Sequence, residues 1–130
     1  MSTTAKQMMI DARSQVPFVS AQVVSDELAA GAVLVDIREP EEWLHGHIEG
    51  SVPAVRGYLE FFADPTSPRH KDGLDPSRRT IVVCASGARA SLAAVTLQSL
   101  GYTDVAVLDG GIKAWTDAGL ATTEHEYAGI

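Results

Sequence analysis

The stretch TIVVCASGARASLAAVTLQSL, residues 80–100, decides the fold class. It opens with a β-branched and apolar run, Thr80 to Cys84, of the length and composition typical of a strand buried on both faces. A turn of small residues follows, and then Arg89 to Leu100 reads as a helix that Gly101 ends. A strand that leads through a tight turn into a helix is the repeating unit of parallel α/β sheets.

The same alternation continues on both sides of this stretch. Apolar runs at residues 32–36 and 105–108 predict two more strands, and residues 51–52 a short one. Further helices are expected over residues 20–30, 40–44, 58–63 and 112–118. We therefore predict an α/β fold with a mainly parallel sheet of about four or five strands and helices on both faces. Ligands of such sheets bind beyond the carboxyl ends of the strands, which is where Cys84 lies.

The length of 130 residues fits one domain. Residues 4–16 carry apolar side chains at helical spacing, and Pro17 ends that pattern. We expect residues 1–18 to be a helical N-terminal extension packed on a domain formed by residues 19–130. The longest loop, residues 64–79, contains three prolines and many charges.

Composition narrows the possible partners and locations. The net charge of -7 disfavours binding to nucleic acid, because an acidic chain repels a phosphate backbone. We find no basic amphipathic stretch for a membrane surface, no membrane-spanning run and no signal peptide. Because the chain has a single cysteine, it cannot form an intramolecular disulfide, and this is compatible with a reducing compartment. The expected location is the cytoplasm.

The turn after Cys84 has the features of an anion-binding nest. Small residues and Gly87 allow the backbone to curl, so that several N–H groups point inward at the start of a helix. A cysteine in that position is expected to react as a thiolate, and Arg89 adds a permanent positive charge. The alternative is an inert cysteine at the end of a buried strand. The glycine and the arginine favour the reactive thiol.

The chain resembles the rhodanese family from about Val19 to Gly119. Four segments in order carry the resemblance: Val33 to Trp43, Gly46 to Ser51, Ile81 to Arg89, and Asp109 to Ile112 with Trp115. The resemblance implies a rhodanese-like sulfurtransferase, of the thiosulfate:cyanide type, in which Cys84 carries sulfane sulfur as a persulfide.

Within this family, the loop residues that bind the substrate would be Ala85, Ser86, Gly87, Ala88 and Arg89. The resemblance implies a small anionic donor, thiosulfate or a thiol persulfide, and a nucleophilic acceptor such as cyanide or a thiol. It leaves open a protein that accepts the sulfur, and it implies no metal and no organic cofactor. Transfer through a covalent intermediate predicts ping-pong kinetics.

Three further features bear on the site. Asp36 and Arg38 follow a buried strand and are expected to support the active-site loop through hydrogen bonds and an ion pair. His45 and His47 are a poor metal-ligand set, so a local hydrogen bond is expected for His47. Relatives that use thiosulfate often carry a basic residue after the cysteine. Because Ala85 stands there, we expect weak thiosulfate activity and better use of persulfides.

Two other functions remain as alternatives. Cysteine-based phosphatases and arsenate reductases also pair a cysteine with an arginine, but typically with five residues between them, whereas Cys84 and Arg89 are separated by four. The shorter loop favours a single sulfur atom over a tetrahedral oxyanion. A non-catalytic interaction module of the rhodanese type is the other alternative, and the presence of Cys84 disfavours it.

Overall fold

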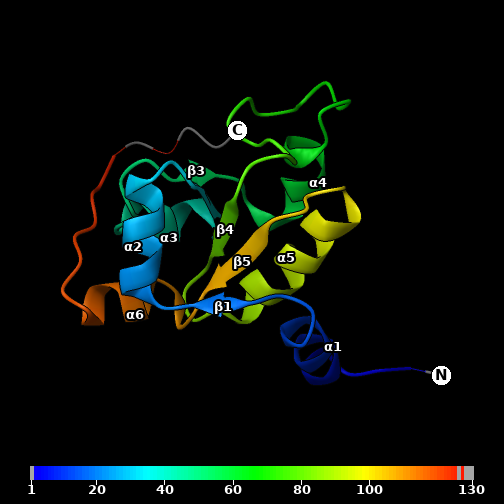
Figure 1. The fold of residues 1–130 in the computed structure, drawn as a ribbon, viewed down its shortest axis with the longest axis horizontal. Helices are drawn as coiled ribbons and strands as arrows, with labels where there is room; N and C mark the ends of the chain where they lie inside the picture. The colour runs from blue at the N-terminus through cyan, green and yellow to red at the C-terminus, as the bar shows by residue number, and fades with distance from the viewer. Residues whose placement is uncertain (1, 126, 128–130) are drawn as a thin grey trace.

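A computed structural model describes residues 2–125 and 127. Its centre is one parallel sheet of five strands in the order β1-β5-β4-β2-β3, seen in Figure 1. The strands are β1 Phe18–Val19, β2 Val33–Asp36, β3 Val52–Pro53, β4 Thr80–Val83 and β5 Val105–Leu108. The predicted α/β class, with a mainly parallel sheet of four or five strands, is confirmed.

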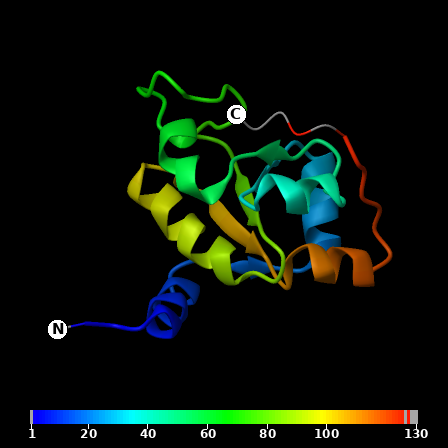
Figure 2. The ribbon, with the colours of Figure 1, turned by 180° about the vertical axis from the view of Figure 1, so that it is seen from behind.

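Helices alternate with the strands along most of the chain. They are α1 Ala5–Arg13, α2 Ala21–Ala29, α3 Pro40–Leu44, the 3-10 helix η1 Arg56–Tyr58, α4 Leu59–Ala63, α5 Ala88–Ser99 and α6 Gly111–Asp117. Ser20 caps the start of α2, because its hydroxyl accepts a hydrogen bond from the Val23 N–H. In Figures 1 and 2, α2 and α6 cover one face of the sheet, and α4 and α5 cover the other.

Successive residues of the central strands point to opposite faces of the sheet and therefore belong to two hydrophobic cores. On one face, Val35, Val82 and Val107 pack with side chains of α4 and α5, among them Phe62 and Leu97. On the other face, alternate strand residues pack with α2 and α6, through Leu34, Ile81, Leu108, Val24 and Trp115. All four residues of β2, β4 and β5 are buried, as expected for strands covered on both sides.

The first helix, α1, lies outside this layered arrangement and packs beside α5 (Figure 2). Val16, which follows α1, is buried in the core on the α5 side. The Gln98 side chain of α5 donates a hydrogen bond to the Gln15 carbonyl at 3.2 Å. The chain then enters β1, which adds the fifth strand at the edge of the sheet beside β5.

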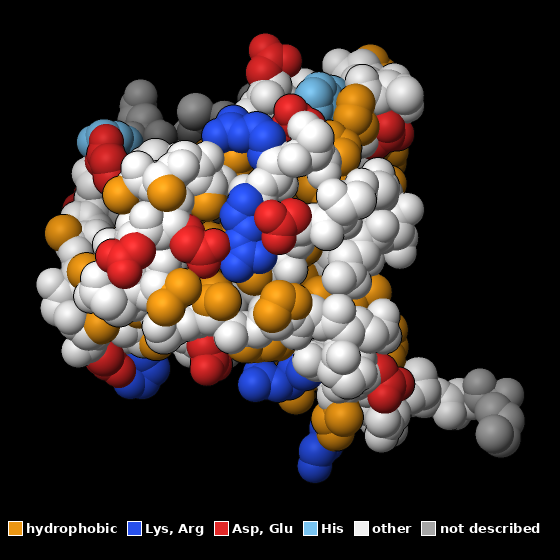
Figure 3. Space-filling model, in the orientation of Figure 1, with side chains coloured by type: hydrophobic (Ala, Val, Ile, Leu, Met, Phe, Trp, Pro, Cys, Tyr) orange, Lys and Arg blue, Asp and Glu red, His pale blue; other side chains and the backbone are white. Residues whose placement is uncertain are grey.

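Charged groups are spread over the surface. Acidic and basic side chains are interspersed on the face shown in Figure 3, so the net charge of -7 is not gathered into one patch there. Within the described residues, no helix has the length and apolar composition that a membrane crossing needs.

Candidate active site

Cys84 follows the last residue of β4 at the carboxyl edge of the sheet and is 1% exposed. Gly87 turns the chain into α5 with a φ of 107°. An L side chain rarely adopts that conformation, so a glycine is needed at this point of the turn. The first residue of α5, Ala88, follows at once. The tight turn from strand to helix that the sequence predicts is present.

Backbone N–H groups surround the Cys84 sulfur. The Gly87 N–H donates to Sγ at 3.1 Å and the Ala90 N–H at 3.4 Å. The N–H groups of Ala85, Ser86 and Ala88 have no acceptor within the described residues. The loop therefore offers donors both to the sulfur and to an anion that approaches it.

The start of α6 holds the opposite side of this loop. The Ile112 N–H donates to the Cys84 carbonyl at 3.0 Å and the Lys113 N–H to the Ala85 carbonyl at 3.3 Å. Gly111, with a φ of 61°, lies against both carbonyls, and a Cβ there would come within 2.5 Å of the Ala85 oxygen. Only glycine allows α6 to approach this closely. These two bonds hold the Cys84 loop against the start of α6.

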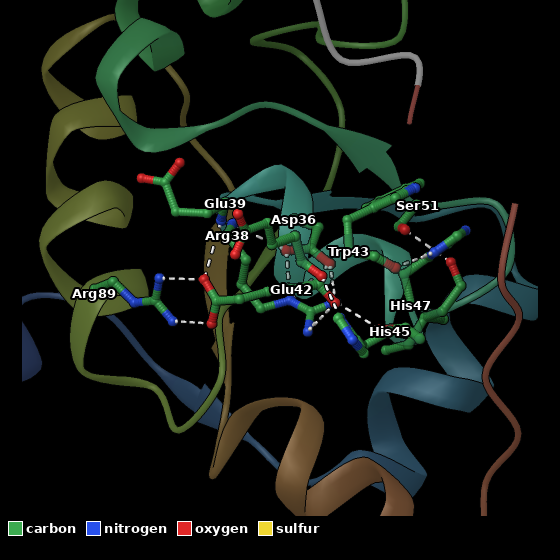
Figure 4. A network of polar contacts seen from close by, with 12 residues as sticks. Asp36, Arg38, Glu39, Glu42, Trp43, His45, His47, Ser51 and Arg89 are labelled. Atoms are coloured by element: carbon green, nitrogen blue, oxygen red, sulfur yellow. Dashed lines mark hydrogen bonds and ion pairs between the residues drawn. The ribbon is translucent and has the colours of Figure 1, made fainter. Parts of the chain in front are cut away.

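Arg89 does not present a free charge to the loop. Its two Nη atoms donate to the two carboxylate oxygens of Glu42 on α3, each at 2.8 Å (Figure 4). This bidentate bond, helped by the Glu39 N–H, lowers the pKa of Glu42 to about 2 although partial burial opposes the shift. The Glu42 carboxylate in turn raises the pKa of Arg89. The formal charge that the sequence assigns to the loop is thus cancelled by a carboxylate 47 positions away.

Asp36 and Arg38 form a buried ion pair, at 1% and 6% exposure, with Arg38 Nη2 and Asp36 Oδ2 2.9 Å apart. Arg38 also donates to the carbonyls of Glu42, at 3.3 Å, and Gly46, at 2.8 Å. Its bonds within the described residues hold α3 and the turn after it, and none reaches the Cys84 loop. Arg38 positions α3, and α3 carries the Glu42 partner of Arg89 (Figure 4).

The two histidines make local hydrogen bonds. His47 Nδ1 lies 2.9 Å from the Trp43 carbonyl, and His45 Nδ1 lies 2.7 Å from the Glu41 carbonyl. The His47 ring also stacks on Trp43, with centroids 3.6 Å apart. His47 therefore packs against the end of α3. The local hydrogen bond expected for this side chain is present.

The structure places Cys84 and Gly87 in the turn between β4 and α5, and Arg89 in the first turn of α5, with its side chain on Glu42. Neither Glu42 nor Gly111 has a role that the sequence alone predicts. The signal for Glu42 was its place in a run of acidic residues, which gave no partner. The signal for Gly111 was the paired glycine after β5, since a second glycine directly before a helix points to a close backbone contact.

Comparison with known proteins agrees with this geometry. Residues 20–118 match the model of the rhodanese-like domain. The thiosulfate sulfurtransferase GlpE of Stutzerimonas stutzeri is 33% identical over 97 residues, which cover 75% of this chain and 82% of that protein.

Two solved structures extend the comparison. A protein of unknown function from Rhodopseudomonas palustris, described as a possible tyrosine phosphatase, has a TM-score of 0.87 and 35% identity, covering 95% of this chain and 96% of that one. The polysulfide-sulfur transferase homodimer of Wolinella succinogenes has a TM-score of 0.75 and 25% identity, covering 95% and 89%. By its matched domain and its relatives, the chain belongs to the rhodanese-like domain family.

Proposed function

We propose that the protein is a sulfurtransferase that carries sulfane sulfur as a persulfide on Cys84. The donor is thiosulfate or a thiol persulfide, and the acceptor is a nucleophile such as cyanide or a thiol. The observation that carries the proposal is the placement of Sγ against the Gly87 and Ala90 N–H groups, beside further loop N–H groups without an acceptor within the described residues.

The chemistry needs an anionic sulfur before and after transfer. The Cys84 thiolate attacks the outer sulfur of thiosulfate, a new S–S bond forms, and sulfite leaves with the electron pair of the bond that breaks. An acceptor such as cyanide then attacks the outer sulfur, forms thiocyanate and returns the thiolate. Backbone donors stabilise the thiolate in both steps and the persulfide anion between them.

The surroundings of Arg89 favour a persulfide over thiosulfate as the donor. Thiosulfate is a dianion, and the loop has no uncompensated formal charge because Glu42 pairs with Arg89. Ala85 adds no charge either. The similarity to a polysulfide-sulfur transferase supports the same choice of donor.

The test is to load the purified protein with a sulfane donor and measure its intact mass. Cys84 should gain the mass of one sulfur atom, and dithiothreitol should remove it. Cys84→Ser, which keeps the shape of the side chain, should neither gain the mass nor transfer sulfur to cyanide. Transfer that survives in Cys84→Ser would refute the role of Cys84.

An aryl phosphate assay tests the other reaction class, which the relative described as a possible tyrosine phosphatase brings forward. With four residues between Cys84 and Arg89, and with Arg89 held by Glu42, we expect negligible phosphate release. Turnover of the aryl phosphate that depends on Cys84, without persulfide formation, would assign the protein to the phosphatases instead.

A further inference from the structure

Residues of α1 and α5 line a groove between these two helices, which pack against each other and are seen in Figures 1 and 2. It encloses a cavity of about 390 Å³, a size that suits a small organic molecule. Apolar side chains form much of its walls, those of Met8 and Ala12 on α1 and of Leu92 and Val95 on α5, and the polar residues Asp11, Gln15 and Thr96 also line it. Met8 remains 51% exposed although it lines this wall. The groove is thus a largely apolar surface left open to solvent.

Two arginines line the same groove. Arg56 bonds Glu60 at 3.1 Å and the Thr96 hydroxyl at 3.0 Å, and Arg89 bonds Glu42. Their side chains are 36% and 42% exposed, and their carboxylate partners are also accessible. Exposed ion pairs contribute little to stability, so the anionic group of a ligand can replace Glu60 at Arg56, whereas the bidentate bond keeps Arg89 with Glu42.

The groove reaches the first turn of α5, which follows the Cys84 loop. Arg89 lines it, and the next residue, Ala90, donates its N–H to Cys84 Sγ. On the other side of α1, a smaller cavity is lined by Met9 and by Ala88, the first residue of α5. A molecule that occupies the groove can therefore extend along α5 toward the loop that carries the persulfide.

We propose that this groove binds the body of an organic thiol or thiol persulfide that has an apolar chain and an acidic group. The apolar chain lies between α1 and α5, the acidic group meets Arg56, and the sulfur reaches Cys84. This inference rests on the proposed function and gives the substrate class of its site. Thiosulfate and cyanide are too small to need the groove.

The first test is a series of mercaptocarboxylates of increasing chain length, used as acceptors for Cys84 persulfide. Each methylene that enters the apolar groove should raise kcat/KM about twofold to fourfold, until the cavity is filled. Mercaptohexanol should be a poorer acceptor than mercaptohexanoate, because it lacks the acidic group. If kcat/KM is independent of chain length, the groove is not a binding site.

The second test changes the groove wall. Met8→Glu places a negative charge among the apolar side chains, and Ile10→Glu is its matched control. Ile10 lies on the same helix, is 45% exposed and is not among the residues that line the groove. In Met8→Glu, the ratio of kcat/KM for mercaptohexanoate to that for cyanide should fall at least tenfold, and in Ile10→Glu it should keep the wild-type value.

The outcomes separate the two proposals. If the ratio is unchanged in Met8→Glu while cyanide still accepts sulfur from Cys84, the groove inference is overturned and the sulfurtransferase function stands. The groove inference also fails if both variants lower the ratio equally, because a negative charge anywhere on α1 would then be enough to weaken the reaction with mercaptohexanoate. If the wild-type protein transfers sulfur to no acceptor, the proposed function itself fails.

Discussion

Two neighbouring turns at the same edge of the sheet handle charge in different ways. The turn after β2 contains side-chain charges that cancel: Asp36 and Arg38 form a buried pair with both partners at or below 6% exposure. The turn after β4 contains Cys84, whose sulfur is met by the N–H groups of Gly87 and Ala90. The ion pair after β2 stabilises the structure, whereas the backbone N–H groups after β4 are oriented so that they can stabilise an anion.

Arg38 and Arg89, one near each turn, differ in how deeply their ion pairs are buried. Arg38 is almost fully buried, whereas Arg89 is 42% exposed in its pair with Glu42. Removing one partner of a buried pair leaves an uncompensated charge, while an exposed pair contributes little. Arg38 should therefore govern stability, and Arg89 should govern which donors the site accepts.

The largest effect should come from breaking the buried pair. Arg38→Ala leaves the Asp36 carboxylate buried without its partner, so the free energy of unfolding should fall by about 3–5 kcal/mol. Urea denaturation measures the change. Lys113→Ala, which removes an exposed pair with Asp117, is the control and should leave the free energy of unfolding nearly unchanged. A loss below about 1 kcal/mol in Arg38→Ala would erase the contrast between the two turns.

The second effect concerns the carbonyls behind the Cys84 loop. In Gly111→Ala, the new Cβ would collide with the carbonyls of Cys84 and Ala85 and displace the loop from α6. We expect kcat/KM for sulfur transfer to fall about 10- to 100-fold, equivalent to about 1.4–2.8 kcal/mol.

A second glycine variant serves as the control for Gly111→Ala, because it strains the backbone without displacing the Cys84 loop. Gly101 has a φ of 93° with no atom near its would-be Cβ, so Gly101→Ala strains the backbone without touching the site. It should lose stability and retain its kcat/KM. Equal losses of kcat/KM in both variants would show that Gly111 matters only for folding.

The sequence is sufficient to predict the fold because its signals are local. Apolar runs give β2, β4 and β5, and the Ser20 cap and Gly31 bracket α2. The edge strand β1 was only a short apolar step in the sequence. Two residues are too few for a periodic pattern, and Phe18–Val19 becomes a strand because β5 offers an open edge.

The site is harder to predict, because part of it depends on contacts between distant segments. The Cys84 loop is contiguous and could be identified from its residue types. The pairing of Arg89 with Glu42 depends on where α3 packs after β2, and no local spacing encodes that position. The same holds for the contact of Gly111 with the loop, which requires α6 to meet the end of β4.

A third variant adds a positive charge to the turn after β4, where Arg89 is already paired with Glu42. Ala85→Arg places a guanidinium directly after Cys84, where it has no carboxylate partner of its own. A unit pair near 4 Å is worth about 4 kcal/mol at an effective dielectric of about 20, and solvent and salt reduce this to about 1–2 kcal/mol. Steady-state assays should show kcat/KM for thiosulfate rising about tenfold at low salt.

The salt dependence and the second donor check this interpretation. The gain for thiosulfate should shrink as salt rises, and the rate with a thiol persulfide should change less. If Ala85→Arg folds normally and leaves the thiosulfate kinetics unchanged at low salt, the shape of the pocket sets donor preference rather than charge.

The smallest effect concerns the stability of the exposed pair and its pH dependence. The bond to Arg89 lowers the pKa of Glu42 from the ordinary value of 4.5 to about 2. A lowered pKa means that the carboxylate stabilises the fold above pH 4.5 and loses this contribution as the pH falls through about 2. Because the side chain is 33% exposed, solvent screening leaves about 1 kcal/mol of the contribution.

Glu42→Gln tests this, because the amide keeps the shape of the side chain and does not titrate. The free energies of unfolding of wild type and variant, measured by urea denaturation from pH 7 to 3, should differ by about 1 kcal/mol at pH 7. The difference should shrink steadily below pH 4.5, because the unfolded wild-type chain then binds a proton at Glu42, whereas the folded chain keeps this carboxylate ionised until the pH nears 2. A difference that stays constant to pH 3 would mean that the bond to Arg89 contributes no charge-dependent stability. The two turns would then differ in burial alone.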